Sequence, residues 1–371
     1  MIDRRTWLGG AIGLSLTSQL RGAIPVHQRR TIFGVNCFDL FYRSANGRGF
    51  TDPYPILKPL ADHGIKFVRF NGGFFWPNEW RKFDQDPAHF TGLMDQVVEA
   101  AERANVGLVP SIIWFPAGVS DYVGEAQSAW GDPASHTWIF AKEYIRNLVS
   151  RYKGSAAIWM WEFGNEFNAF ADFVGSERFF PPVSVKFGTP AKRTAADRLT
   201  SREVQTAFGH FAEIVRSLDG TRPISSGAHF PRARMMNDAR GIGAPDTPVQ
   251  LRDALKLSLS GETDMLSVHL YQDSLKGRFA QQGTNFSQLL SVVRAAADAK
   301  GAGMFVGEFG LPSNAKDHSP AVLDDMIAAI QANRADYAAL WNYDYWPNDP
   351  YTVSFSGDRA WQLAALGKAN L

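Results

Sequence analysis

Two glutamates stand at the ends of short hydrophobic runs, and a pair of carboxyl groups can combine acid–base with nucleophilic chemistry. Glu166 ends the run IWMWEFGNE, which begins at Ile158, and Glu308 lies in GMFVGEFG, which begins at Gly303. Two carboxyl groups held about 5–5.5 Å apart suit a retaining glycosidase, in which one attacks the anomeric carbon and the other donates and later accepts a proton. The sequence suggests this pair, and the fold must bring its members together.

Other side chains near the ends of similar runs could support the pair. Arg69 occurs in FVRFN, His269 and Tyr271 occur in VHLY, and Trp341 follows a further run. A guanidinium lowers the pKa of a nearby carboxyl group and a phenol can donate to it, so Arg69 and Tyr271 could keep Glu308 ionised, as a nucleophile requires. Structural alternatives remain open: a core histidine for His269, an ion-pair partner for Arg69 and ordinary core for Trp341.

Glu166 has a different requirement, because a general acid must hold its proton when the substrate arrives. We therefore expect Glu166 to be partly desolvated and to act as a base after it has lost that proton. Glu162 has the same strand parity and is the rival for this role. It lies four residues deeper, where we expect it inside the fold and paired with a cation. A purely structural carboxylate is the alternative for Glu308.

These residues need a scaffold that brings the ends of distant segments together. Short β-branched and aromatic runs recur eight times, each followed by a loop and a helical pattern, which is typical of parallel βα units. Eight such units predict an α/β fold, a single (β/α)8 TIM barrel with elaborated βα loops and with its working residues at the C-terminal strand ends. The runs begin near Thr31, Lys66, Gly107, Ile158, Arg222, Met265, Gly303 and Tyr337.

Helical patterns between the runs support this count. Apolar residues at helical spacing predict a helix within 135–152, and a capping box at Thr200 and Glu203 predicts another. Ser319-Pro320 offers a cap and a first-turn proline for a third helix. The helix of the fifth unit, within 228–262, is the hardest to place. No linker or internal repeat interrupts the series, so we expect one domain over 28–371.

Aromatic side chains in the loops after the strands are candidates for stacking on sugar rings. Trp76 and Trp80 follow the second run, Trp130 follows the third and Trp346 follows the eighth. Packing within the loops would explain them equally well. The segment 167–201 is a long connection rich in phenylalanine, and such loops are usually functional or disordered. Its aromatic density argues against disorder, so we expect it to wall one side of a cleft.

Composition disfavours several classes of function. The formal net charge is +1 and no long basic run occurs, which argues against a nucleic-acid partner. Cys37 is the single cysteine, so an intrachain disulfide and a cysteine-based zinc site are excluded. The histidines lack HxH or HExxH spacing and no phosphate-binding glycine motif occurs, so we expect no metal and no cofactor. The expected partner is a carbohydrate, and the sequence leaves the oligomeric state open.

Residues 1–23 resemble an export signal of the twin-arginine type. Arg4-Arg5 precede Trp7-Leu8, an uncharged stretch over 9–20 and small residues. A buried amphipathic helix is the alternative, but the stretch lacks a polar stripe at helical spacing. We expect a periplasmic or secreted protein with no membrane segment once the signal is removed.

The chain resembles the clan A glycoside hydrolases and, within them, glycoside hydrolase family 5, the cellulase and mannanase family. The motifs that carry the resemblance are Asn165-Glu166 ending the fourth strand and GEFG, with Glu308, ending the seventh. The resemblance spans nearly the whole chain after the signal, and it implies a retaining mechanism with Glu166 as acid/base and Glu308 as nucleophile. Supporting positions also match, namely Arg69, His269, Tyr271 and Trp341.

Substrate contacts can be expected beside the resemblance. Asn165 is suited to hydrogen-bond the sugar 2-hydroxyl, and Trp341 offers a face for the apolar side of the reacting sugar. Trp114 stands at the end of the third strand, where many members of the family have a histidine. This departure means that whatever the histidine contacts is contacted differently here.

The leading hypothesis is an exported retaining hydrolase that cleaves β-linked glucan- or mannan-type polysaccharides or oligosaccharides. An exo-acting β-glycosidase or a transglycosylase of the same clan is the second hypothesis, which the length of 167–201 favours. A non-catalytic carbohydrate-binding barrel is the third, although a binding site has no need for two opposed carboxylates.

Overall fold

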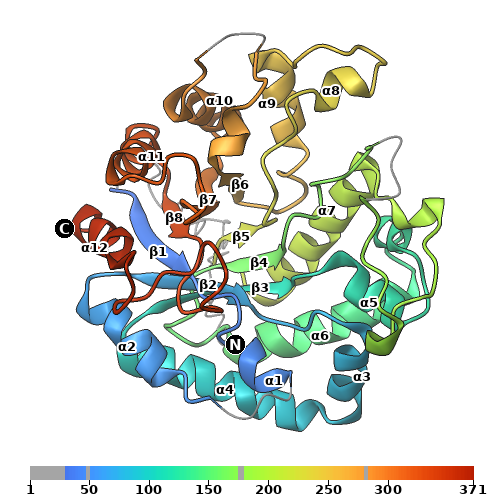
Figure 1. The fold of residues 1–371 in the computed structure, drawn as a ribbon. Coiled ribbons are helices and arrows are strands. Elements are labelled where there is room, and N and C mark those ends of the chain that lie inside the picture. The colour runs from blue at the N-terminus through green and yellow to red at the C-terminus, as the bar shows by residue number, and fades with distance from the viewer. Residues whose placement is uncertain (1–29, 47–50, 174–178, 280–282) are drawn as a thin grey trace, which may run out of the picture.

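Eight parallel strands form a closed barrel in which each strand pairs with its neighbours in chain order and β8 pairs with β1 (Figure 1). The computed structural model describes residues 30–46, 51–173, 179–279 and 283–371. The predicted (β/α)8 architecture is confirmed. The strands are β1 (Ile32–Asn36), β2 (Phe67–Asn71), β3 (Gly107–Ile113), β4 (Trp161–Gly164), β5 (Ile224–Ser225), β6 (Met265–Leu270), β7 (Gly303–Phe309) and β8 (Tyr337–Leu340).

The fourth and fifth strands are shorter than the sequence runs that predicted them. Ile158 forms only an isolated bridge with Leu108, and regular pairing begins at Trp161. β5 has two residues, and the chain then leaves the sheet through Gly227, whose φ is +67°. A side chain at position 227 would collide with the carbonyl oxygen of Gly164, so glycine lets this loop pass close to the end of β4.

Helices surround the barrel, as Figure 1 shows. Many of them begin with a proline or a capping box, which satisfies or removes the free N–H groups of the first turn. The longer helices are α2 (Tyr54–Asp62), α3 (Pro77–Gln85), α4 (Pro87–Ala104), α5 (Pro116–Tyr122), α6 (His136–Tyr152), α7 (Ser201–Leu218), α9 (Pro248–Lys256), α10 (Phe286–Asp298), α11 (Pro320–Ala332) and α12 (Ala360–Ala369). Short α1 (Tyr42–Ala45) and α8 (Met235–Asp238) and the 3-10 turns η1 (Gln127–Gly131), η3 (Val185–Phe187), η4 (Ala195–Asp197) and η5 (Gln272–Leu275) lie in the connections.

The helix predictions hold, with one difference in capping. The capping box of Thr200 and Glu203 is present at the start of α7. Ser319 precedes α11, but its side chain makes no capping hydrogen bond, so Pro320 alone marks this start. The fifth unit, which the sequence left open, contains the short α8 and then α9 with its own capping box of Thr247 and Gln250.

The last helix closes the N-terminal end of the barrel onto its first strand. The Asn370 side chain accepts from the Phe33 N–H at 2.9 Å and donates to the Phe33 carbonyl at 2.9 Å. At the same end of the barrel, side chains of different strands form a separate apolar cluster. Its buried members are Phe67, Val109, Met160, Met265, Phe305 and Ala339.

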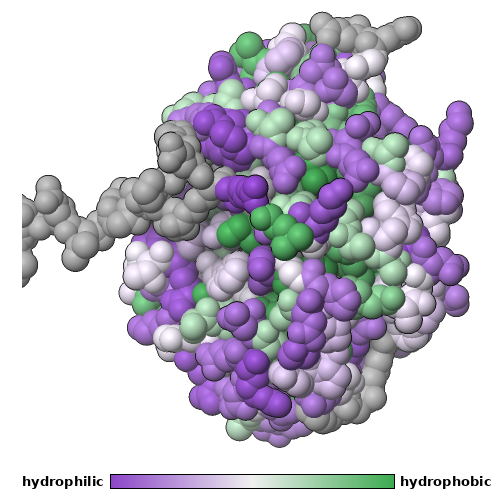
Figure 2. All heavy atoms as spheres, turned by 90° about the vertical axis from the view of Figure 1, so that its left-hand side faces the viewer, coloured by the Kyte–Doolittle hydropathy of each residue, from purple (hydrophilic) through white to green (hydrophobic). Residues whose placement is uncertain are grey.

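The face of the molecule on the side of α11 and α12 is predominantly hydrophilic (Figure 2). Seen from the side of α11 and α12, polar residues surround small groups of hydrophobic ones (Figure 2). Among the described residues, no helix is both long and apolar enough to cross a membrane. The proposed export signal over 1–23 lies outside the described residues.

We predict that Phe67→Ala destabilises the fold by about 3–5 kcal/mol, because the fully buried ring leaves a cavity against Phe305 and Tyr337. Phe67 begins β2, at the opposite end of the strands from the candidate catalytic residues, so activity per folded molecule should be retained. Thermal unfolding measures the loss. Ile139→Ala, at a position 61% exposed on α6, is the control and should unfold like the wild type.

Candidate active site

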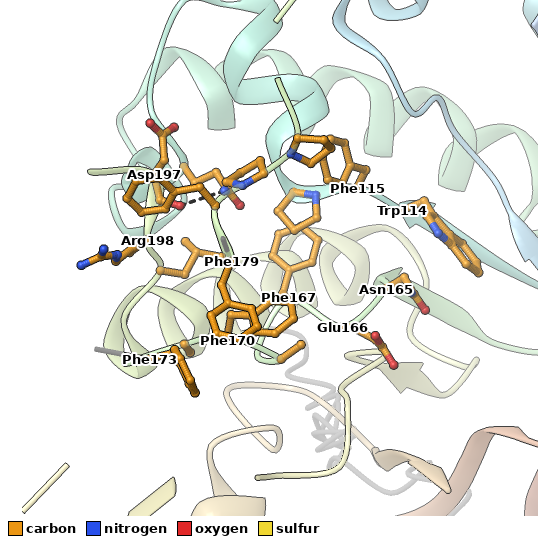
Figure 3. Close-up of a pocket in the computed structure, with 18 of the residues that line it drawn as sticks. Trp114, Phe115, Asn165, Glu166, Phe167, Phe170, Phe173, Phe179, Asp197 and Arg198 are labelled. Atoms are coloured by element: carbon orange, nitrogen blue, oxygen red, sulfur yellow. Dashed lines mark hydrogen bonds between the residues drawn. The ribbon is translucent and has the colours of Figure 1, made fainter. Parts of the chain in front are cut away.

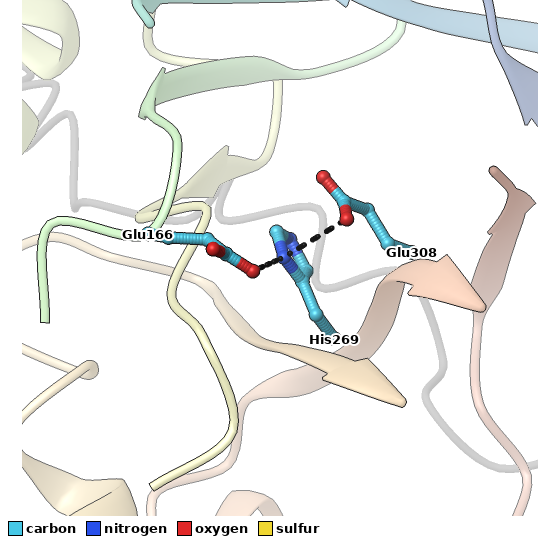
Figure 4. A group of neighbouring side chains, drawn as sticks. All are labelled: Glu166, His269 and Glu308. Atoms are coloured by element: carbon cyan, nitrogen blue, oxygen red, sulfur yellow. Dashed lines mark hydrogen bonds and ion pairs between the residues drawn. The ribbon is translucent and has the colours of Figure 1, made fainter. Parts of the chain in front are cut away.

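The ends of β4 and β7 place Glu166 and Glu308 opposite each other. Each offers a carboxylate oxygen within 4.8 Å of the other, with a ring nitrogen of His269 inside the same distance. Figure 4 shows the glutamates pointing toward each other across His269. Since β4 ends at Gly164, Glu166 lies just beyond it, with φ at +55° and its N–H donating to the Gly227 carbonyl at 2.9 Å. Such a backbone conformation is costly for a residue with a side chain and is typical of functional sites.

Glu308 is held by donors on both of its oxygens. The Arg69 guanidinium donates to Oε1 at 3.0 Å, and the Tyr271 hydroxyl donates to Oε2 at 2.7 Å. Both contacts expected from the sequence are present. Burial, followed by the charge of Glu308, raises the pKa of Tyr271 well above its ordinary value, so the phenol remains a donor. His269 Nδ1 lies 3.5 Å from the same Oε2.

Arg69 is fully buried and connects four strands of the barrel. Besides Glu308, it donates to Glu162 Oε1 at 2.6 Å, to Asn36 Oδ1 at 2.9 Å and to Asn165 Oδ1 at 2.8 Å. Glu162 therefore has the buried cation partner expected from the sequence. Its other oxygen accepts from Ser225. Glu162 is fully buried beneath the mouth of the barrel, so its carboxyl group cannot reach a substrate.

Glu166 has imidazoles as neighbours in place of fixed cations. Oε1 of Glu166 is 2.7 Å from His269 Nδ1 and 4.0 Å from His229 Nε2. Because a carboxylate only accepts, Nδ1 of His269 carries the hydrogen in this pair. Burial raises the pKa of Glu166, but the positive charges of protonated His229 and His269 outweigh it and lower the pKa to about 2.

This pKa differs from the sequence expectation of a desolvated, protonated acid. Desolvation is present, but the expectation took no account of two imidazoles beside Glu166. Their attraction and the hydrogen bond from His269 favour the carboxylate form of Glu166.

Two polar residues of the site were missed by the sequence reasoning. His229 follows β5 by four residues, and Asn36 ends β1 and donates to the Gly307 carbonyl at 2.9 Å. A polar side chain at a strand end was the available signal for Asn36. β5 is too short and irregular for the position of His229 to be read from strand spacing.

Aromatic side chains from β1, β3 and β8 gather beside the carboxylates. Trp114 and Trp341 stack with ring centroids 6.0 Å apart and an angle of 25° between the rings. Phe38 packs edge-on against Trp114 at 4.9 Å, and the Arg69 guanidinium lies 4.8 Å above the Trp114 ring. Trp114 is buried and Trp341 is partly buried, so Trp341 keeps part of its ring accessible in the mouth.

Other aromatic candidates lie elsewhere. Trp76 is half-buried and stacks on Phe187 with centroids 4.8 Å apart, so it is not brought together with the carboxylates. Trp80 and Trp130 are fully buried in the core. The interpretation of these two as sugar-stacking residues is wrong. Trp80, on the inner face of α3, packs against Phe74 and Tyr144. Trp130 packs against Trp138 of α6 and Phe163.

A cavity of about 300 Å³ adjoins Glu166 (Figure 3). Asn165 and Glu166 lie at one end of it, and residues of the segment 167–201 form much of its wall. The structure thus places this long connection beside the acid/base candidate, as expected for one wall of a cleft. Trp114 and Phe115, which follow the end of β3, also line it.

Glu166, His269 and Glu308 also form a group that could hold a metal ion. Their facing atoms are already engaged, since both carboxylates accept hydrogen bonds from His269, Arg69 or Tyr271. The negative charge in the mouth is thus compensated by protein groups. The expectation that no cofactor is needed stays a prediction.

The chain matches a known protein family and part of a known enzyme. Residues 55–349 match the family Cellulase (glycosyl hydrolase family 5). The mannan endo-1,4-β-mannosidase A of Hypocrea jecorina is 35% identical over 80 residues, which span 20% of this chain and 18% of the relative. The matched segment is thus a small part of that relative.

Solved structures share the fold at low sequence identity. The endo-1,4-β-D-mannanase of Thermotoga petrophila RKU-1 is 14% identical with a TM-score of 0.65, over 92% of this chain and 99% of that one. The endo-1,4-β-mannanase of Rhizomucor miehei is 14% identical with a TM-score of 0.63, over 93% and 96%. The endoglucanase Cel5A of Pseudomonas stutzeri is 16% identical with a TM-score of 0.56, over 91% and 93%.

We predict that His229→Asn raises the pKa of Glu166 by about one unit, because a positive charge that favours the carboxylate is removed. Titration of the carboxyl carbons in ¹³C-glutamate-labelled protein measures the change. His136→Asn is the control, since this imidazole is 77% exposed at the start of α6. An unchanged or lower pKa in His229→Asn would contradict the electrostatic role of His229.

Proposed function

The chain belongs to glycosyl hydrolase family 5, which makes it an O-glycosyl hydrolase, and from that premise we propose that it cleaves β-glycosidic bonds of glucan- or mannan-type saccharides with retention at the anomeric carbon. The observation that carries the proposal is the separation of the carboxyl oxygens of Glu166 and Glu308, within 4.8 Å. Retaining enzymes hold their carboxyl groups about 5–5.5 Å apart, whereas inverting enzymes leave room for a water between them.

In the first step, a Glu308 oxygen attacks the anomeric carbon while the glycosidic bond breaks. Glu166 transfers its proton to the departing oxygen, and a glycosyl ester of Glu308 results. In the second step, Glu166 takes a proton from water, the water oxygen attacks the anomeric carbon and the ester bond breaks. Arg69 and Tyr271 keep Glu308 ionised and oriented before the attack.

The reacting sugar is bound by neighbours of this pair. Asn165 accepts from Arg69 through Oδ1, which leaves its amide N–H groups to donate to the 2-hydroxyl. Trp341 offers its partly exposed ring to the apolar face of the sugar. Trp114 stacks against the Trp341 ring from behind. It stands after β3, at the position where many members of the family have a histidine.

Glu166 must hold the proton in the productive complex. When a sugar fills the mouth, water is displaced and the ionised form of Glu166 becomes less favourable. Loss of water around Glu166 thereby favours its protonated form. His269 Nδ1, which faces both glutamates, is placed to stabilise the carboxylate again when Glu166 has given up its proton.

The choice of an internal or a terminal bond is a finer part of the proposal. The relatives with similar folds are named endo-acting mannanases and an endoglucanase. The long segment 167–201 beside Glu166 favours the alternative, an exo-acting β-glycosidase or a transglycosylase. The sizes of the products released from a defined oligosaccharide distinguish the two.

We also propose that the protein is exported, to the periplasm or beyond, by the twin-arginine route. The support is the sequence of residues 1–23, with its paired arginines and uncharged stretch. This route carries folded proteins, which suits a barrel whose single cysteine is buried and needs no oxidative folding.

We predict that Glu308→Ala lowers kcat by several orders of magnitude, while Glu166→Ala spares aryl glycosides with good leaving groups in the first step. Azide should then accelerate turnover of Glu166→Ala, because a small anion can attack the ester without a base. The product should be the β-glycosyl azide, identified by NMR. An α-azide, or equal losses on all substrates, would contradict a retaining mechanism with Glu166 as acid/base.

We predict that Arg4→Lys combined with Arg5→Lys leaves the protein in the cytoplasm, since the paired arginines are the recognised feature of this signal. Immunoblots of cytoplasmic and exported fractions measure the distribution. The single variant Arg21→Lys, outside the pair, should be exported normally. Normal export of the double variant would contradict the twin-arginine route.

A further inference from the structure

The cavity beside Glu166 has a lining unlike that of the catalytic mouth. Phenylalanine and proline rings form most of it: Phe75, Phe115, Pro116, Phe167, Phe170, Phe173, Phe179, Phe180, Pro181 and Pro182. Figure 3 shows several of these rings gathered at one end and Trp114, Asn165 and Glu166 at the other. The cavity therefore joins an apolar compartment to the acid/base residue.

The position of the cavity relative to the two glutamates is asymmetric. Glu166 lines it, whereas Glu308 and the side chains around Glu308 do not. The acid protonates the oxygen of the leaving group, so the leaving group must lie on the Glu166 side of the broken bond. The cavity thus extends from the reacting sugar's site, which it meets at Asn165 and Trp114, toward the leaving-group side.

The polar groups at the far end of the lining are already engaged. Gln127 donates to the Asp197 carbonyl at 2.9 Å, and the Asp197 carboxylate accepts from the Thr194 N–H at 2.7 Å. The Arg198 guanidinium lies 4.7 Å above the Phe180 ring. Sugar hydroxyls buried among these groups would find few partners, which is unfavourable, whereas a flat apolar group would lose nothing.

The wall of the cavity is built before any ligand arrives. Arg193 donates to both oxygens of Asp121 in α5 at 2.6 and 2.8 Å, and both side chains are almost completely buried. The Asp172 N–H also donates to the Leu199 carbonyl at 3.0 Å, which joins the two ends of the segment. Ordering of the described parts of this wall, 167–173 and 179–201, therefore costs little on binding.

Phe170 is 50% exposed although it lies among other rings. It stacks on Phe179 with centroids 4.8 Å apart, and Phe173 packs edge-on against Phe179 at 4.4 Å. Because half of the Phe170 side chain is exposed to solvent, part of its apolar surface is available for contact with a ligand. Phe170 is the accessible ring with which a ligand in the cavity would make contact.

We propose that this cavity is a leaving-group subsite for flat apolar aglycones, so that β-glycosides of aromatic or similar apolar alcohols are preferred over saccharides with the same glycone. The proposal rests on the proposed function, because it assigns the cavity through the role of Glu166. It adds a class of substrate to that function. The sugar attacked by Glu308 is the same as in the proposed function, and the leaving group is apolar.

Phenyl and 2-naphthyl β-glycosides of the same sugar test the proposal, because phenol and 2-naphthol leave with similar acidity and differ mainly in ring area. We expect kcat/KM to be about tenfold higher for the naphthyl glycoside. Phe170→Ala should bring this ratio close to one, because loss of the ring weakens binding of the larger naphthyl group more than binding of the phenyl group. Val183→Ala, exposed on the same segment but outside the lining, is the matched control and should keep the ratio.

Calorimetric binding of 2-naphthol separates this proposal from the proposed function. We expect saturable binding to the wild type and to Val183→Ala, and its loss in Phe170→Ala, whether or not any glycoside is hydrolysed. Hydrolysis with a naphthyl-to-phenyl ratio near one and no 2-naphthol binding would overturn the subsite and leave the hydrolase intact. Binding of 2-naphthol without hydrolysis of any glycoside would support the cavity and overturn the proposed function.

Discussion

The buried guanidinium of Arg69 is the interaction on which the site depends. It carries a full charge in the barrel interior, where an unpaired charge would be strongly unfavourable, and Glu162 and Glu308 together compensate it. These contacts join β2 to β4 and β7, and Asn36 adds β1. Arg69 also donates to Asn165, the residue before Glu166. One side chain therefore helps to position both glutamates.

The barrel explains why such a cluster can form from residues far apart in the chain. Parallel strands deliver their C-terminal ends to one rim, so residues 69, 165, 269 and 308 meet although long helical connections separate them. The apolar cluster around Phe67 fills the N-terminal end of the barrel interior. The polar groups occupy the interior near the C-terminal strand ends. Stability and chemistry thus occupy different ends of the same strands.

The sequence was sufficient for the barrel, for the starts of most strands and for the glutamate pair, because each depends on local patterns of two to nine residues. The regular parts of β4 and β5 begin later than their sequence runs. Loop geometry was not predictable in this way. Trp80 and Trp130 have the same sequence cues as Trp341, but both are buried against rings of α6, and only tertiary packing decides this. His229 reaches Glu166 because Gly227 turns the chain beside β4, a conformation with no periodic signal.

The different partners of the two glutamates explain how one site gives them different roles. The groups that donate to Glu308, a guanidinium and a phenol whose pKa is raised, keep their protons throughout, so the charge of this carboxylate is fixed. Glu166 instead has two imidazoles beside it, with His269 Nδ1 at 2.7 Å. The proposed nucleophile thus has fixed donors, and the proposed acid/base has imidazole neighbours. His269 contacts both carboxylates, whereas the Arg69 guanidinium donates to Glu308 and not to Glu166, and the proposed roles follow this asymmetry.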